Sequence, residues 1–118
     1  MITIYHNPRC QKSRTALQHI ESLDTDVKIV EYLKNPPSVK ELKEVLKLLQ
    51  LKPVDLVRKK EPLFVSKYKD GSYSDTQWIK ILVENPILIE RPIVINGDKA
   101  IIARDEVSLK KIKYYKIY

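Results

Sequence analysis

The fold is decided by the stretch Ile2-Thr3-Ile4-Tyr5-His6-Asn7-Pro8-Arg9-Cys10, which joins a β-favouring run to a turn and then to a helix start. Ile2 to Tyr5 favours a strand, and Asn7-Pro8 stops it. A helix is predicted from about Cys10 to Ser22, because apolar residues recur at three- and four-residue spacing at Ala16, Leu17, Ile20 and Leu23. Val27 to Tyr32 predicts a second strand. Strand, helix and strand at this spacing are typical of a βαβ unit with a parallel strand pair.

A helical stretch is expected after Asn35-Pro36-Pro37, which interrupts the βαβ pattern. Ser38 and Glu41 form a capping box, and an apolar stripe follows at Leu42, Val45, Leu46 and Leu49. A short helical turn is expected at Val54 to Val57. Arg58 to Tyr73 contains Pro62, Gly71 and mixed charges, which predicts an irregular loop.

A further helix and a final hairpin are expected in the last third of the chain. Ser74 and Gln77 form a second capping box, ahead of Trp78, Ile81 and Leu82. Asn85-Pro86 ends that helix. A strand, a turn and a partner strand follow at Pro92 to Ile95, Gly97-Asp98 and Ala100 to Ala103. Asp105 can then cap a last helix that carries Val107, Leu109 and Ile112.

The order of these elements defines the fold class. It is β-α-β, a helical stretch, and then β-β-α, which is an α/β class with a mixed sheet of the thioredoxin-like kind. The length of 118 residues suits one domain. We therefore expect a single thioredoxin-like domain over residues 1–118, with a helical insertion at about residues 36–86.

The composition restricts the classes of partner. The chain is 43% apolar and 31% charged, with a formal net charge of +7, so it is a globular protein that favours anions. The densest basic run consists of Lys110, Lys111, Lys113 and Lys116, interleaved with Tyr114, Tyr115 and Tyr118. We interpret this run as the basic end of a helix, because cations stabilise a helix C-terminus, and we expect no nucleic-acid partner.

Cysteine usage and the N-terminus indicate the compartment. A single cysteine cannot form an internal disulfide. The first residues lack the basic head and apolar stretch of a signal peptide, and no apolar run approaches the ~20 residues that a membrane span needs. We expect a cytoplasmic monomer with no membrane association.

Cys10 lies where the first strand gives way to the first helix, and chemistry in α/β sheets collects at that end. The N-terminus of a helix and neighbouring cations lower a thiol pKa, and Arg9, Lys12 and Arg14 all lie within four residues of Cys10. A lone cysteine is more often a small buried apolar residue. The position and the charges nevertheless favour a reactive thiolate.

Two further side chains belong to this candidate site. His6 could act as a general base, although a supporting electrostatic role is the interpretation we favour. Ser13 lies one helical turn after Cys10, so its hydroxyl can reach the sulfur; ordinary capping of the first turn is the alternative. His6 and His19 with one cysteine make a poor metal site, and we expect no metal.

Several separated segments together resemble the glutaredoxin-dependent arsenate reductases of the ArsC/Spx family, which have a thioredoxin-like fold. The segments span nearly the whole chain: Ile4-Tyr5-His6-Asn7-Pro8-x-Cys10-x-x-Ser13-Arg14, Tyr32-Leu33-x-Asn35-Pro36-Pro37-Ser38, Leu56-Val57-Arg58-Lys59, Asn85-Pro86-Ile87-Leu88-Ile89-x-Arg91-Pro92-Ile93-Val94, and Arg104. The resemblance implies that Cys10 is the nucleophile and that Arg58, Arg91 and Arg104 converge on the oxyanion. Arg14 is expected to assist in substrate binding. Planar guanidinium groups suit this task, because they form charge-assisted, often bidentate hydrogen bonds to tetrahedral oxyanions.

The resemblance also implies a reaction. The Cys10 thiolate would attack arsenate and form a covalent adduct. Since the chain has no second cysteine, glutathione and then glutaredoxin would serve as external reductants, and arsenite would be released. No bound cofactor is expected. Pro92 matches the position at which thioredoxin-like folds carry a cis-proline that faces the active cysteine.

Departures from the family leave alternatives open. Well-known members have small or glycine-containing residues beside the cysteine, whereas this chain has Arg9, Gln11 and Lys12. Those bulkier side chains could change which oxyanion or thiol is accepted, so a related reductase with another substrate is one alternative. An Spx-like regulator that binds RNA polymerase is another, although such proteins commonly use a Cys-x-x-Cys switch and Ser13 replaces the second cysteine.

Overall fold

The computed structural model describes residues 1–112, in which the chain forms two compact units. The first, which we call the Cys10 unit, comprises Met1–Tyr32 and, of the described residues, 91–112. The second, the insertion unit, comprises Leu33–Glu90. Lys113 and Lys116 of the basic C-terminal run lie outside the described residues. Within residues 1–112, no helix has the length and apolar character that a membrane crossing requires.

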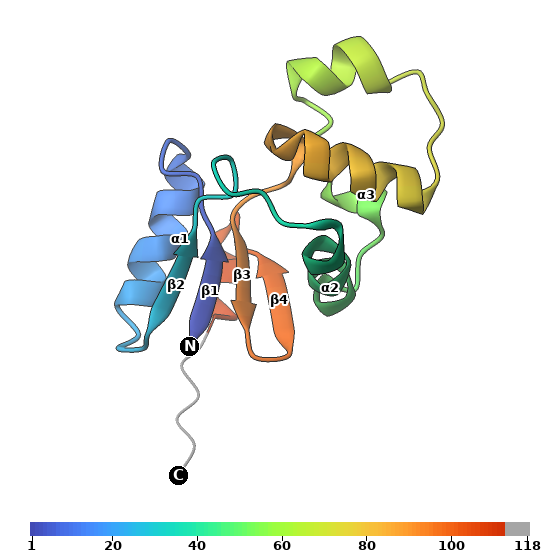
Figure 1. Ribbon diagram of the computed structural model, residues 1–118. Coiled ribbons are helices and arrows are strands. Elements are labelled where there is room, and N and C mark those ends of the chain that lie inside the picture. Colours follow the sequence, from blue (N-terminus) through green and yellow to red (C-terminus); the bar gives the residue numbers. More distant parts are fainter. Residues whose placement is uncertain (113–118) are drawn as a thin grey trace. The chain divides into compact units, whose positions relative to one another are not determined.

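A four-stranded mixed sheet forms the centre of the Cys10 unit, with strand order β2-β1-β3-β4 (Figure 1). The strands are β1 (Ile2–Tyr5), β2 (Val27–Val30), β3 (Ile93–Asn96) and β4 (Lys99–Ile102). The pair β1 and β2 is parallel, with Ile2 opposite Val27, whereas β3 is antiparallel to both β1 and β4. The predicted thioredoxin-like order of elements is therefore confirmed. Gly97 has φ +64 in the turn between β3 and β4, a backbone conformation that favours glycine.

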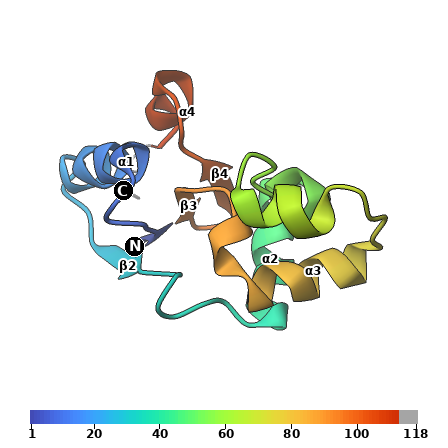
Figure 2. The ribbon, with the colours of Figure 1, turned by 90° about the horizontal axis from the view of Figure 1, so that it is seen from above.

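Two helices pack on one face of this sheet (Figure 2). They are α1 (Gln11–Glu21) and α4 (Glu106–Lys110). Their shared core contains Ile2, Ile4, Ala16, Ile20, Val94, Ala103 and Ile112, with Leu17, Leu23 and Leu109 packed against it. The apolar face predicted for α1 is thus the buried face. Asp105 caps α4 as expected, because its carboxylate accepts a hydrogen bond from the Ser108 N–H at 2.7 Å.

The insertion unit is helical. Its elements are α2 (Val39–Leu49), η1 (Pro53–Leu56), η2 (Phe64–Tyr68), α3 (Asp75–Glu84) and η3 (Pro86–Leu88). Helix α3 contacts α2, η1 and η3. Both predicted capping boxes are present, with Ser38 accepting from the Glu41 N–H and Ser74 accepting from the Gln77 N–H. These boxes satisfy N–H groups that the first turn of a helix cannot pair internally.

The prediction of an irregular loop from Arg58 to Tyr73 is wrong over η2. This segment forms a π-helical turn, in which the Lys69 N–H donates to the Phe64 carbonyl at 2.9 Å. The turn begins just after Pro62, a residue that is well tolerated at the start of a helix. Packing of Phe64 and Tyr68 against other aromatic rings stabilises the turn, and such tertiary packing leaves no periodic signal in so short a segment.

Candidate active site around Cys10

Cys10 is the N-cap residue of α1, at the point where the loop after β1 turns into the helix. Its backbone is extended, with φ −96 and ψ 122. The Cys10 N–H donates to the Asn7 carbonyl, and the Cys10 carbonyl accepts from the Arg14 N–H, each at 3.0 Å. The side chain is a free, partly exposed thiol. The sulfur is therefore held at the positive end of the α1 dipole and remains accessible to a small reactant.

The loop that carries Cys10 is organised by Ser13, whose side chain is fully buried. The Ser13 hydroxyl accepts a hydrogen bond from the Asn7 N–H at 3.0 Å and lies 2.6 Å from His6 Nδ1. Asn7 in turn accepts a hydrogen bond on Oδ1 from the Arg9 N–H at 3.0 Å. His6, Asn7 and Ser13 are all buried, and their mutual hydrogen bonds compensate for the loss of hydration.

The pKa of the Cys10 thiol is lowered from its ordinary value. Burial is the largest single influence on this pKa and raises it. A hydrogen bond from the Arg91 guanidinium, a hydrogen bond from the Ser13 backbone N–H, the positive charge of Arg91 and a hydrogen bond from the Lys12 backbone N–H together outweigh that effect. All four stabilise the thiolate over the thiol, so the nucleophilic form is favoured.

Ser13 acts on the sulfur through its backbone rather than through its hydroxyl. We expected the hydroxyl to reach the sulfur, but it is engaged by His6 and Asn7, and the hydrogen bond to the sulfur comes from the Ser13 N–H. The Ser13 hydroxyl therefore supports the loop, and the Ser13 backbone N–H makes the contact with the sulfur.

The pKa of His6 is also lowered. Burial is the main cause, and the positive charge of Arg14 adds to it, while Glu31 and Glu21 oppose it. A lowered pKa keeps the ring neutral at pH 7. Because the Asn7 N–H already donates to the Ser13 hydroxyl, that hydroxyl is free to donate its own proton to His6 Nδ1. We assign the His6 proton to Nε2 on this basis.

The three cations that lie close to Cys10 in the sequence differ in how they interact with its sulfur. Arg9, Lys12 and Arg14 are exposed, and the Arg14 guanidinium donates to the Pro8 carbonyl at 2.9 Å. Lys12 acts through its backbone N–H. The cation that hydrogen-bonds the sulfur is Arg91, which is remote in sequence. Proximity along the chain could not reveal this contact, and only the family resemblance pointed to it.

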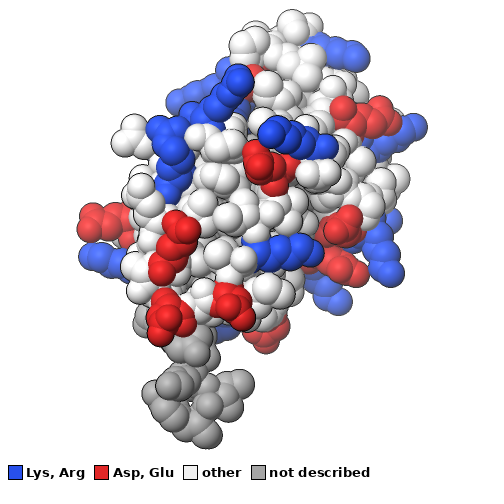
Figure 3. All heavy atoms as spheres, turned by 60° about the vertical axis from the view of Figure 1, so that its left-hand side comes forward, with Lys and Arg blue, Asp and Glu red and all other residues white. Residues whose placement is uncertain are grey.

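Charge is nevertheless segregated along α1. The three exposed cations surround its N-terminal end, and Glu21, Asp24 and Asp26 are exposed at or just beyond its other end. Figure 3 shows this face, with basic side chains gathered towards its upper left and acidic side chains towards its lower end. The Cys10 end of the helix therefore attracts anions.

The arginines expected to bind substrate fall into both units. Arg91 precedes Pro92 through a cis peptide bond, as predicted, and Arg104 lies between β4 and α4, half-buried in the Cys10 unit. Arg58 belongs to the insertion unit. Its guanidinium is 2.6 Å from a carboxylate oxygen of Glu61 and 3.8 Å from one of Glu90. The Arg58 side chain is thus oriented by two carboxylates.

This arrangement suits nucleophilic attack on an anion. A sulfur with a lowered pKa lies beside a guanidinium group and two backbone N–H groups, which can also stabilise negative charge on a reacting oxyanion. Over residues 1–112, no cluster of three or more His, Cys, Asp or Glu side chains could hold a metal ion. The fold and this site together define a thioredoxin-like protein with a reactive thiol.

Comparison with known families makes the assignment specific. Residues 5–112 match the model of the ArsC family, so the chain belongs to that family. It is 40% identical over 113 residues to a Haemophilus influenzae protein named arsenate reductase, with 94% of this chain and 97% of that protein covered. An Escherichia coli relative named uncharacterized protein YfgD is 39% identical over 105 residues, covering 87% of this chain and 88% of the relative.

Solved structures agree with this assignment. A structure described as a putative arsenate reductase from Yersinia pestis superposes with a TM-score of 0.89 at 40% identity. The superposition covers 95% of this chain and all of that one. The thioredoxin-like fold of the ArsC family is therefore the fold of this chain.

Proposed function

We propose that this protein reduces arsenate to arsenite, with Cys10 as the nucleophile. The observation that carries the proposal is the lowered pKa of Cys10, whose sulfur is hydrogen-bonded by Arg91 and by two backbone N–H groups. A thiolate is the form that attacks an electrophilic centre. Membership of the ArsC family, with relatives named arsenate reductase, supports arsenic(V) as that centre.

The proposed chemistry begins with attack of the Cys10 sulfur on arsenic(V). A sulfur–arsenic bond forms, and one arsenate oxygen is protonated and leaves as water. A glutathione thiolate then attacks the Cys10 sulfur, and the sulfur–arsenic bond breaks with its electron pair remaining on arsenic. The two thiols thereby supply the two electrons that convert arsenic(V) to arsenic(III), and they end as a mixed disulfide. Glutaredoxin reduces that disulfide and restores Cys10.

Four arginines are proposed to bind the oxyanion: Arg14, Arg58, Arg91 and Arg104. Arg91 has the strongest structural support, because it hydrogen-bonds the sulfur and carries a charge that a bound oxyanion can share. His6 and Ser13 are proposed to hold the loop and to keep the Ser13 N–H directed at the sulfur. No bound cofactor enters this scheme.

A coupled assay tests the proposal. Wild-type protein with glutathione, glutaredoxin, glutathione reductase and NADPH should oxidise NADPH only when arsenate is present. Cys10→Ser should lower that rate about a thousandfold or more, because the nucleophile is removed. Thr15→Ala, an exposed change on the same helix, is the matched control and should keep the wild-type rate.

Intact-mass measurement gives a second readout. Incubation of the wild-type protein with arsenate and glutathione, without glutaredoxin, should add one glutathione to the protein, and Cys10→Ser should gain nothing. Full arsenate-dependent activity in Cys10→Ser would overturn the proposal. A reactive Cys10 that gains glutathione equally with and without arsenate would overturn arsenate as the substrate.

A further inference from the structure

Arg58, one of the arginines proposed to bind the oxyanion, is flanked by two carboxylates of its own unit. The Arg58 Nη1 donates to Glu61 Oε2 at 2.6 Å, and the Arg58 Nε lies 3.8 Å from Glu90 Oε1. The exposed fractions of the three side chains are 19%, 16% and 22%, so water screens their charges only in part. The two carboxylates are not equivalent, because Glu61 is within hydrogen-bond distance and Glu90 is not.

The backbone holds Arg58 in a fixed position. Val57 and Ile89 form an isolated antiparallel bridge, and the Arg58 N–H donates to the Leu88 carbonyl at 2.7 Å beside it. Val57, Leu88 and Ile89 are buried, so this pairing is part of the packed interior of the insertion unit. The Arg58 side chain therefore projects from a point that the fold determines.

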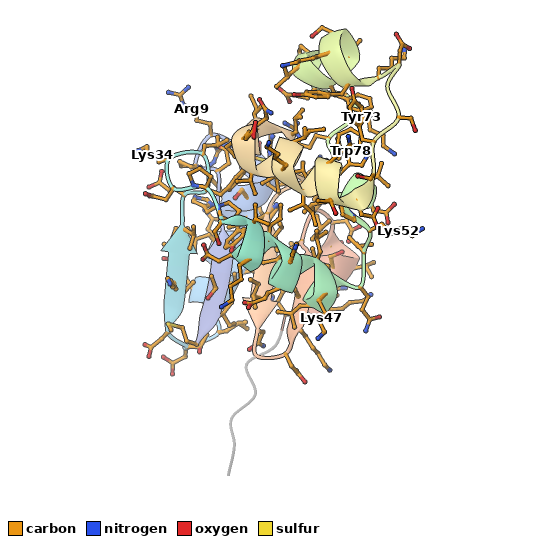
Figure 4. All side chains as sticks on the ribbon, turned by 45° about the vertical axis from the view of Figure 1, so that its right-hand side comes forward. Arg9, Lys34, Lys47, Lys52, Tyr73 and Trp78 are labelled. Atoms are coloured by element: carbon orange, nitrogen blue, oxygen red, sulfur yellow. The ribbon has the colours of Figure 1, made fainter. Side chains whose placement is uncertain are left out.

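The backbone of Glu61 is fixed as well. Its N–H donates to the Arg58 carbonyl at 3.1 Å, which closes a tight turn between the two residues. The turn is followed by η2, whose Phe64 stacks on Trp78 with ring centroids 6.3 Å apart. Tyr73 lies edge-on to the same tryptophan at 4.9 Å, and Figure 4 shows these two side chains next to each other. The Glu61 carboxylate thus reaches the guanidinium from a segment that aromatic packing anchors.

The Glu61 carboxylate has two opposing effects on a bound oxyanion. A free arginine side chain has many rotamers and loses that freedom when it binds an anion. A hydrogen bond from Nη1 to Glu61 restricts these rotamers before the anion arrives, which favours binding. The negative charge of Glu61 repels the anion and opposes binding. An experiment on Glu61 must therefore separate the hydrogen bond from the charge.

We propose that Glu61 is a positioning residue for oxyanion binding. Its carboxylate holds the Arg58 guanidinium in the orientation in which that group binds the oxyanion, so Glu61 acts through Arg58 and not by contact with the substrate. The inference rests on the substrate-binding role proposed for Arg58.

Paired substitutions separate the hydrogen bond from the charge. Glu61→Gln and Glu61→Ala remove the same negative charge, but the amide oxygen of glutamine can still accept from Arg58 Nη1. Arsenate binding is measured by isothermal titration calorimetry in the Cys10→Ser protein, which lacks the nucleophile. The Kd for arsenate should be about tenfold weaker with alanine than with glutamine at position 61, which is the lower end of the effect of a hydrogen bond to a charged group.

A double-substitution cycle tests whether Glu61 acts through Arg58. Arg58→Met should itself weaken arsenate binding about tenfold or more, and in that background the Kd values with alanine and glutamine at position 61 should be equal. Glu84→Ala is the matched control. Glu84 is an exposed glutamate on α3 whose carboxylate lies 4.0 Å from Lys80 Nζ, and its loss should leave the Kd unchanged.

An NMR measurement on the wild-type protein keeps the test independent of variants that fold poorly. The Nε–H group of Arg58 should be as rigid as the backbone in heteronuclear relaxation and should shift when arsenate is added, whereas the Nε–H group of the exposed Arg9 should be mobile. An Arg58 side chain as mobile as that of Arg9 would overturn the inference.

Three binding results would also overturn it: no binding of arsenate, equal Kd values for Glu61→Gln and Glu61→Ala, or a difference between them that persists in Arg58→Met. The coupled NADPH assay decides the proposed function separately. Absence of arsenate turnover in the wild type, with the expected Kd values intact, would overturn arsenate reduction and still support the role of Glu61.

Discussion

The two units of this protein bury different kinds of side chain. In the described structure, the buried polar residues are His6, Asn7 and Ser13, and all of them lie in one loop and helix start of the Cys10 unit. The buried side chains of the insertion unit are aliphatic, apart from the aromatic pair Tyr68 and Trp78. The insertion unit follows the ordinary pattern of a small helical fold, with apolar stripes and capped helix ends.

The buried polar side chains therefore lie beside the reactive cysteine, at a place where apolar side chains would otherwise fill the core. A buried polar group is costly unless it is hydrogen-bonded, so a cluster of three is retained only where its arrangement is needed. Here the cluster fixes the loop that directs the Ser13 N–H at the Cys10 sulfur. Changes in this cluster should affect both stability and thiol chemistry, whereas changes in the insertion-unit caps should affect stability alone.

Ser13→Ala should lower the free energy of unfolding more than Ser38→Ala or the titration of His6 does. The change leaves the buried Asn7 N–H without its acceptor and removes the partner of His6 Nδ1, which should cost about 1–3 kcal/mol of unfolding free energy. Urea denaturation measures this cost. Thr15→Ala, an exposed change on α1, should have little effect. Wild-type stability in Ser13→Ala would break the distinction between the two units.

Ser38→Ala should lower the free energy of unfolding by less than Ser13→Ala. Loss of the capping box of α2 should cost about 1 kcal/mol, because the Glu41 N–H loses its acceptor. The same urea experiment measures the loss, and the coupled arsenate assay should show an unchanged rate at a temperature where the variant is folded. A fall in rate well beyond the unfolded fraction would contradict the assignment of the Ser38 cap to stability alone.

Protonation of His6 should change the free energy of unfolding least of the three. Its folded pKa is lowered by burial, so the unfolded chain binds the proton more readily. This contribution to stability is complete above the unfolded pKa of about 6.5 and is lost as pH falls from there through the folded pKa. An NMR titration of His19→Gln, in which His6 is the remaining histidine, measures the folded value. A His6 pKa at or above about 6.5 would contradict the lowering of this pKa by burial.

Local signals predicted much of the fold. The two capping boxes, Asp105 at the start of α4 and the apolar face of α1 each depend on residues within one or two turns, and each is present. The turn at η2 was missed, because five residues are too few to show a helical period and the contacts that stabilise them come from Tyr73 and Trp78.

In the candidate site, too, the sequence predicts local features but not contacts between distant residues. The position of Cys10 at a helix start could be predicted from the strand, the turn and the helix that surround it. The sequence could not show which cation contacts the sulfur. Three cations lie near Cys10 in the sequence, namely Arg9, Lys12 and Arg14, but the guanidinium that hydrogen-bonds the sulfur belongs to Arg91. A contact between residues so far apart is set by the pairing of β1 with β3, which brings the start of β3 next to the end of β1.

Arg91 lowers the pKa of the Cys10 thiol, and the pH dependence of Cys10 alkylation measures this effect. Because Cys10 is the only cysteine, the rate of reaction with iodoacetamide between pH 5 and pH 10 gives its pKa without interference. We expect a wild-type Cys10 pKa below the ordinary ~8.5 of a free thiol, a higher pKa in Arg91→Met, and the wild-type pKa in Arg9→Met. A wild-type pKa at or above ~8.5, or identical values in wild type and Arg91→Met, would contradict this expectation.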